Sequence, residues 1–185
     1  MKKLFAIPLL MFFVFACDST TSVEEERDAA REFFDEAEAA EYETVFQTVD
    51  ESTSGNTNFE ESDEIIFESE EEFRDFWVEL NENLPPAADE VDVPDVPVID
   101  FDTKKVIAVL MGTQNTGGYF TTIEEVGVLE GVTGIRVLET EPGENCVTTQ
   151  VLTMPYHIIT VSNELPDEYE FFIERIVLNC PEDDD

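Results

Sequence analysis

His157 is the residue best suited to acid–base chemistry, and it is the only histidine in the chain. Any Ser-His or Cys-His dyad would therefore have to use it as the general base. It falls within a predicted strand over residues 156–161, and no GxSxG motif accompanies it. A single histidine on a strand is usually structural, so we predict no catalytic residue and a protein that is not an enzyme. Because there is also no CxxC pair, we expect no metal site and no cofactor.

Two loops imitate ligand sites but lack essential residues. Residues 112–117, Gly-Thr-Gln-Asn-Thr-Gly, follow an apolar run as a phosphate-binding loop does. Gly118 and Tyr119 stand where that loop needs lysine and serine or threonine, and a strand is predicted to follow instead of a helix. The acidic residues 89–95 lack the glycine turn and the closing glutamate of an EF-hand loop. We therefore expect neither a nucleotide site nor a dedicated calcium site.

The first seventeen residues predict a signal sequence that ends at a modified cysteine. Lys2 and Lys3 precede a twelve-residue apolar stretch, and Ala16 precedes Cys17. The stretch is too short for a permanent membrane span. Residues 14–17, Val-Phe-Ala-Cys, resemble a bacterial lipobox, so we predict a lipoprotein signal peptide over residues 1–16 and lipidation at Cys17. This places the protein outside the cytoplasm, in the periplasm or at the cell surface, anchored to a bacterial membrane. An ordinary secretory signal cut at the same bond is the alternative.

The remaining cysteines support an exported protein. If Cys17 carries lipid, Cys146 and Cys180 are left to form one disulfide in an oxidising compartment. Two buried free thiols are the alternative.

The charge of the chain is strongly unbalanced. There are 45 acidic and 9 basic residues, a net charge of −36. Removing Lys2 and Lys3 with the signal peptide leaves 7 basic residues, so the mature chain carries −38. Such a chain repels phosphate backbones, and we expect no nucleic-acid partner. Salt screening relieves the self-repulsion, so we interpret the acidity as a halophilic adaptation.

Helices are predicted at two places. Ser22 and Glu25 resemble a capping box, and apolar residues at helical spacing follow, which indicates a helix over about 23–40; a loosely ordered acidic tether is also compatible with this composition. Ser69 and Glu72 form a second capping box before a stripe of aromatic residues, which predicts a helix over about 70–82 that packs on a core.

The rest of the chain reads as strands joined by turns. Extended segments are predicted at residues 42–49, 64–67, 106–111, 119–129, 134–140, 147–153, 156–161 and 171–178. The run over 106–111 is continuously apolar and suits a central strand covered on both faces. Closely spaced strands without intervening helices favour a mainly β domain over residues 41–180, an antiparallel sheet or small β-sandwich, followed by an acidic tail at 181–185.

Two loops are the candidate partner-binding elements. They contain Thr116, Gly117, Gly118 and Tyr119 in one and Met154, Pro155 and Tyr156 in the other. Together with Phe76-Trp77, Ile99-Asp100-Phe101, Gly112, Gly143 and Cys146, these motifs make residues 64–161 similar to the C-terminal domain family of the protease-complex subunit PrcB. The resemblance implies a non-enzymatic extracytoplasmic domain, often lipid-anchored, that associates with another protein. The family is named for a subunit that stabilises a subtilisin-like protease, so a protease is the candidate partner.

Three other interpretations stay open. Residues 115–119 resemble the end of the inhibitory loop of chagasin-like inhibitors of cysteine proteases, although its proline is missing. The Gly-Gly turn is also explained by a hairpin with Tyr119 packed as the first strand residue. A purely structural envelope lipoprotein is the third interpretation.

Overall fold

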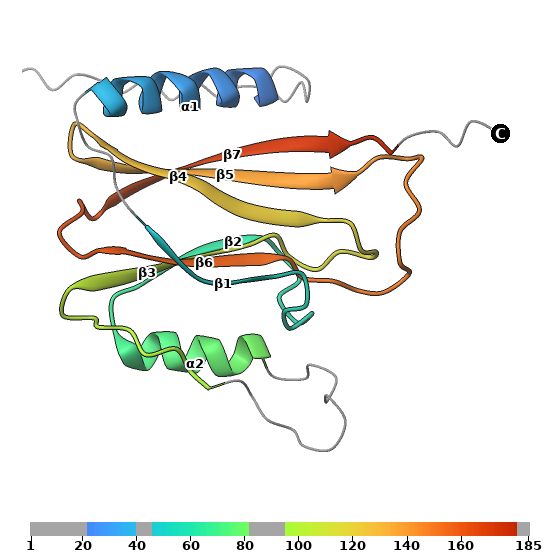
Figure 1. Ribbon diagram of the computed structural model, residues 1–185, viewed down its shortest axis with the longest axis horizontal. Coiled ribbons are helices and arrows are strands. Elements are labelled where there is room, and N and C mark those ends of the chain that lie inside the picture. The colour runs from blue at the N-terminus through green and yellow to red at the C-terminus, as the bar shows by residue number, and fades with distance from the viewer. Residues whose placement is uncertain (1–21, 40–45, 82–94, 181–185) are drawn as a thin grey trace, which may run out of the picture.

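The computed structural model describes residues 22–39, 46–81 and 95–180, and these form four layers. Cys17, the predicted signal peptide and the predicted tail at 181–185 lie outside the described residues. Strands β1 (Gln47–Ser52), β6 (Tyr156–Ser162), β3 (Lys104–Leu110) and β2 (Asp63–Phe67) form one sheet in that order. Strands β4 (Phe120–Leu129), β5 (Val132–Pro142) and β7 (Glu168–Leu178) form the second sheet. Helix α1 (Ser22–Ala39) covers the outer face of the second sheet and helix α2 (Glu70–Asn81) that of the first (Figure 1).

Helix α2 begins at the predicted capping box. The Ser69 hydroxyl donates to the Glu72 carboxylate at 2.8 Å and accepts the Glu72 N–H at 3.3 Å. The aromatic stripe then packs on apolar side chains that β3 and β6 present on one face of the sheet. The resulting core contains Phe67, Phe73, Phe76, Trp77, Leu80, Val106, Ala108, Leu110, Met154, Tyr156 and Ile158.

A second core lies between the sheets. Strand β3 contributes to both cores because alternate side chains point to opposite faces, so the apolar run is buried throughout, as predicted. The residues of the second core are Ile107, Val109, Ile123, Val126, Ile135, Val137, Ile159 and Val161. The mainly β class and the packed helix are therefore confirmed.

Helix α1 is part of this packed structure. Its Phe33 and Phe34 lie on the outer face of the second sheet, with ring centroids 5.1 and 5.7 Å from that of Phe172. Gly127 and Gly134 supply the space for the two rings, because a Cβ at Gly134 would overlap Phe33. The predicted N-terminal helix is confirmed, and it packs on the second sheet instead of forming a loosely ordered tether.

The strands differ from the sequence predictions in two details. Strand β7 runs parallel to β5, whereas the other four described strand pairings are antiparallel, as the predicted mainly antiparallel domain requires. After β5 the chain crosses to the first sheet and runs back as β6. It then returns to the second sheet as β7, which therefore runs in the same direction as β5. Residues 147–153 form no strand of either sheet; Val147, Val151 and Leu152 point into solvent instead of entering a ladder.

Candidate protein-binding surface

The two predicted loops meet at one end of the sandwich. Gln114 and Thr153 exchange backbone hydrogen bonds of 2.7 and 3.0 Å. The Thr153 hydroxyl donates to the Thr116 carbonyl at 2.9 Å, and the Gly117 N–H donates to the Thr149 carbonyl at 3.0 Å. The loop between β3 and β4 is thereby joined along its length to the loop between β5 and β6.

The first predicted loop lies at the surface. Thr116, Gly117 and Tyr119 are partly exposed and Gly118 is exposed. Gly118 has φ of 97°, in the left-handed region that favours glycine, and a Cβ at Gly117 would overlap the Thr149 hydroxyl. Both glycines therefore have a structural role in bringing the two loops together.

The second predicted loop is not exposed, which corrects the expectation that it forms a surface. Met154, Pro155 and Tyr156 are all buried, and Met154 and Tyr156 belong to the core beneath α2. The Tyr156 hydroxyl donates to the Asp50 carboxylate at 2.7 Å, and burial together with that carboxylate raises the pKa of Tyr156. These residues support the adjoining loops from below and cannot contact a partner directly.

The predicted disulfide between Cys146 and Cys180 is present. It links the loop after β5 to the chain that leaves β7, with 5.1 Å between the two Cα atoms. The Gly143 N–H donates to the Leu178 carbonyl at 2.9 Å beside it. The bridge therefore holds residues 143–153 against the ends of β5 and β7.

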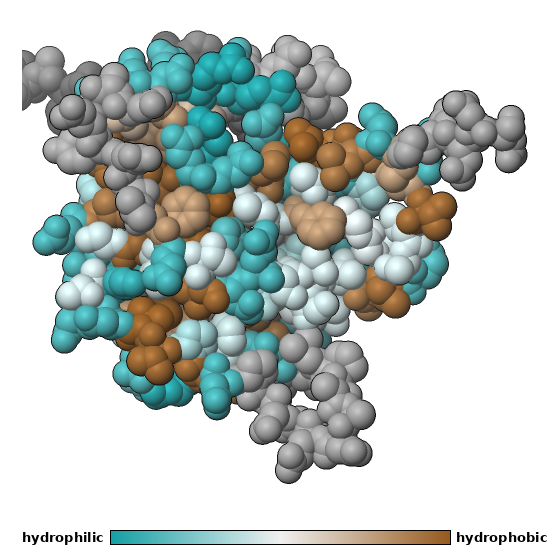
Figure 2. All heavy atoms as spheres, in the orientation of Figure 1, coloured by the Kyte–Doolittle hydropathy of each residue, from teal (hydrophilic) through white to brown (hydrophobic). Residues whose placement is uncertain are grey.

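Around these loops the surface is apolar. We call this region the apolar end, defined by six exposed side chains: Phe120, Val147, Val151, Leu152, Val177 and Leu178. Figure 2 shows brown and white side chains gathered at the right, over the loop between β5 and β6 and the ends of β5 and β7, where teal is sparse. Exposed apolar side chains that gather in one region, here with side chains of intermediate hydropathy between them, mark candidate interaction sites in soluble domains.

The apolar end coincides with two stretches of sequence that contain no Asp, Glu, Lys or Arg. These stretches are residues 106–123 and 145–163. They are exceptional in a chain in which 29% of residues are charged. The six exposed residues of the apolar end were not predicted from the sequence. The absence of charged residues from the two stretches is the signal that could have indicated most of them.

His157 lies beneath this end, between the two sheets, and is only 2% exposed. Its Nδ1 accepts the backbone N–H of Ile123 at 2.8 Å, and its Nε2 lies 3.0 Å from the Thr48 hydroxyl. Because a backbone N–H can only donate, Nδ1 is unprotonated and the neutral ring carries its proton on Nε2. That nitrogen cannot take a proton from Thr48, so the two do not form a nucleophile and general base. Burial lowers the pKa of His157, although Glu51 and Asp50 oppose the shift.

Two other kinds of site are absent from residues 22–39, 46–81 and 95–180. Within them no group of three or more histidine, cysteine, aspartate or glutamate side chains is arranged to hold a metal ion. In the same ranges, no helix has the length and apolar character needed to cross a membrane.

Comparison with family models gives a match to part of the chain. Residues 105–162 match the family model described as PrcB C-terminal. The matched segment runs from β3 to β6 and contains both loops of the apolar end and Cys146, whereas α1, α2 and Cys180 lie outside it. The resemblance seen in the sequence is confirmed over these residues, a shorter stretch than the predicted 64–161. No curated protein and no solved structure matches the chain.

Proposed function

Proceeding from the match to the PrcB C-terminal family, we propose that this chain is a non-catalytic protein-binding module. Its partner is another extracytoplasmic protein, and what the sequence resemblance implies makes a subtilisin-like protease the first candidate. The observation that carries the proposal is the apolar end, where the loop parts of two charge-free stretches expose apolar side chains on a strongly acidic chain. Protein-binding surfaces have cores depleted in charge and enriched in aromatic and aliphatic side chains.

The rigidity of this surface supports the same function. The loop that carries Val147, Val151 and Leu152 is held by the disulfide and by the backbone bonds between Gln114 and Thr153. Because the loop is already ordered, little conformational entropy remains to be lost when a partner binds. Acidic side chains such as Glu141 and Glu144 border the surface and oppose association with other acidic proteins.

A double charge substitution tests the binding surface. The variant Val147→Glu/Leu152→Glu changes two exposed side chains, so its melting temperature should stay within the range of ordinary surface substitutions. Its affinity for a protease isolated on the immobilised wild-type domain should fall at least tenfold, about 1.4 kcal/mol. Val78→Glu, which changes an exposed valine on α2, is the matched control and should bind normally.

Equal binding by the wild type, the double variant and Val78→Glu would exclude the apolar end as the binding site. Capture of no extracytoplasmic protein would favour a structural envelope lipoprotein.

Tyr119 offers a second probe of the same surface. Its ring is partly exposed at the junction of the first loop with β4. If it contacts the partner, Tyr119→Ala should weaken capture by more than about 1 kcal/mol and leave the melting temperature nearly unchanged. If it only supports the turn, a loss of stability of roughly 2 to 4 kcal/mol should precede any loss of binding.

The location of the module belongs to the same proposal. We infer that Cys17 is lipidated and that the domain is held at a bacterial membrane outside the cytoplasm, which the lipobox-like residues 14–17 and the disulfide support. Only residues 18–21 separate Cys17 from α1, so the anchor would hold α1 within roughly 20 Å of the bilayer. A Cys17→Ser variant should accumulate as precursor and lose its partition into detergent. Unchanged partition would contradict lipidation.

A further inference from the structure

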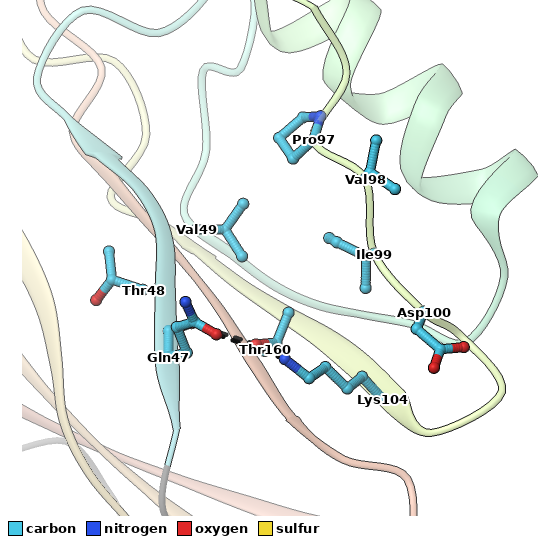
Figure 3. A pocket seen from close by; sticks show the side chains of 9 residues that line it. All are labelled: Gln47, Thr48, Val49, Pro97, Val98, Ile99, Asp100, Lys104 and Thr160. Atoms are coloured by element: carbon cyan, nitrogen blue, oxygen red, sulfur yellow. Dashed lines mark hydrogen bonds between the residues drawn. The ribbon is translucent and has the colours of Figure 1, made fainter.

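A groove lies on the same face of the first sheet as α2, on a part of that face that α2 leaves uncovered. It has a volume of about 390 Å³. Its walls are β1 and residues 97–100, and Thr160 of β6 and Lys104 of β3 lie between them (Figure 3). This volume is within the range of pockets that bind small ligands, roughly 300 to 1,000 Å³.

One part of the groove is apolar. The side chains of Val49 and Ile99 point toward each other from opposite walls in Figure 3. Both are partly buried and pack against the core beneath α2. Pro97 and the fully exposed Val98 continue this wall outward. An aliphatic side chain of a ligand would replace water between Val49 and Ile99.

The other part carries a positive charge that no described acid neutralises. Seven basic residues lie in the part of the chain that the structure describes, and six of them have an acidic partner within 4.0 Å there. These six are Arg27, Arg31, Arg74, Lys105, Arg136 and Arg175. Lys104 is the exception, and its Nζ lies 3.5 Å from Oε1 of Gln47. In a chain with 45 acids, a lysine without such a partner among the described residues is available to an anionic ligand.

Lys104 and Gln47 present their donors side by side. Figure 3 shows the Lys104 amino group reaching across the groove toward the Gln47 side chain. The Gln47 amide uses its oxygen for Lys104, which leaves its NH₂ group for a ligand. Asp100 is the acidic residue of the groove, and its carboxylate already accepts hydrogen bonds from the Asp102 N–H and the Thr103 hydroxyl. The two donors therefore favour a carboxylate, whose two oxygens can each accept one of them.

The combination of the two parts indicates that the ligand is the end of a peptide chain, because its last residue carries a carboxylate and a side chain on one Cα. An α-carboxylate and the side chain of the same residue are close enough to occupy the two parts of the groove together. We propose that the groove binds the C-terminal residue of a peptide that ends in an aliphatic side chain. The carboxylate lies on Lys104 and Gln47, and the side chain lies between Val49 and Ile99.

The test compares a free acid with its amide. N-acetyl-Ala-Ala-Val and the same peptide with a C-terminal amide are titrated into the mature domain at about 0.15 M NaCl, followed by amide NMR shifts of β1 and β6. The acid should bind at least tenfold more tightly than the amide. Lys104→Gln should remove this preference and Lys104→Arg should keep it. Arg74→Gln loses the same charge on α2 and should behave as wild type.

A second substitution separates the two parts of the groove. Ile99→Ala should weaken the acid and the amide to the same extent, because it changes only the apolar wall. The proposal is overturned if acid and amide bind equally, if the preference survives Lys104→Gln, or if no shift in β1 appears at millimolar peptide. None of these outcomes depends on binding at the apolar end, so failure of either proposal leaves the other intact.

Discussion

The His157 ring of β6 accepts the backbone N–H of Ile123 in β4 at 2.8 Å, so a side chain of one sheet is bonded directly to the main chain of the other. The register of β4 with β5 shifts between Ile123 and Glu125. The register of β1 with β6 shifts between Thr48 and Asp50, beside the second partner of the ring. Two irregular strands therefore direct the Ile123 N–H and the Thr48 hydroxyl at one buried imidazole. The bond to Ile123 requires that ring to be neutral.

Acid should weaken the structure through His157. Burial lowers the pKa of the ring in the folded state, so the unfolded chain takes up a proton first as the pH falls below about 6.5. The stability that the ring contributes is complete above that pH and is lost as the pH falls toward the folded-state pKa. The free energy of unfolding of wild type, minus that of His157→Gln, should shrink between pH 7 and pH 5. The change should not exceed about 1.4 kcal/mol per pH unit.

The difference between these two proteins isolates His157 from other groups. Glu64 has its pKa raised by burial and by Asp63 and Glu139, so it favours the folded state at lower pH and acts in the opposite direction. That contribution is present in both proteins and cancels in the difference to first order. A difference that stays constant from pH 7 to pH 5 would show that the folded ring can be protonated without cost.

The contact between Phe33 and Gly134 should be measurable as a coupling. A Cβ at Gly134 would overlap the Phe33 ring, so Gly134→Ala should displace the ring and destabilise the domain by roughly 1 to 3 kcal/mol. In a Phe33→Ala background the obstruction is gone, and the same substitution should be nearly neutral. Chemical denaturation of the four proteins gives the coupling energy. Additive effects would mean that α1 does not pack on β5 as described.

Removing the disulfide should cost stability at the apolar end of the molecule. The bridge joins cysteines separated by 34 residues, and closing a loop of that length stabilises the folded state by about 4 kcal/mol in the chain-entropy model. Cys146→Ser/Cys180→Ser should unfold at a lower denaturant concentration while keeping its β-rich circular dichroism. Reduction of the wild type should produce a similar loss, and no loss in either experiment would contradict the bridge.

Local sequence signals predicted the elements of this fold well. Ser69 and Glu72 marked the start of α2, and the apolar run after Lys105 marked the central strand, because capping and burial leave their pattern within a few residues. The parallel pairing of β5 with β7 left no local signal, since it depends on β6 joining the other sheet. The same limit applies to residues 147–153, whose composition resembles a strand although only Thr153 pairs, in an isolated bridge with Gln114.

The candidate site was predicted only in part. The Thr-Gly-Gly-Tyr loop was placed correctly at the surface, because glycines of this kind mark turns. Met154 and Tyr156 were expected beside it, but a proline next to them gave no indication that the chain enters the core there. Lys104 could not be recognised from the sequence, since its lack of an acidic partner among the described residues depends on the positions of side chains from several strands.

Salt should stabilise this protein. The chain carries a net charge of −36, and most of its described acids have no basic partner, so repulsion among carboxylates opposes the compact state. Raising NaCl from about 0.01 M to about 1 M shortens the Debye length from roughly 30 Å to 3 Å, and the melting temperature should rise over this range.

Because sulfate also strengthens apolar burial, sodium chloride and sodium sulfate should be compared at equal ionic strength below about 0.2 M. Screening predicts the same rise in both salts there, with most of the gain complete before higher concentrations. A flat response would show that the carboxylates are far enough apart to need no screening, and a rise in sulfate alone would assign the effect to apolar burial instead of charge.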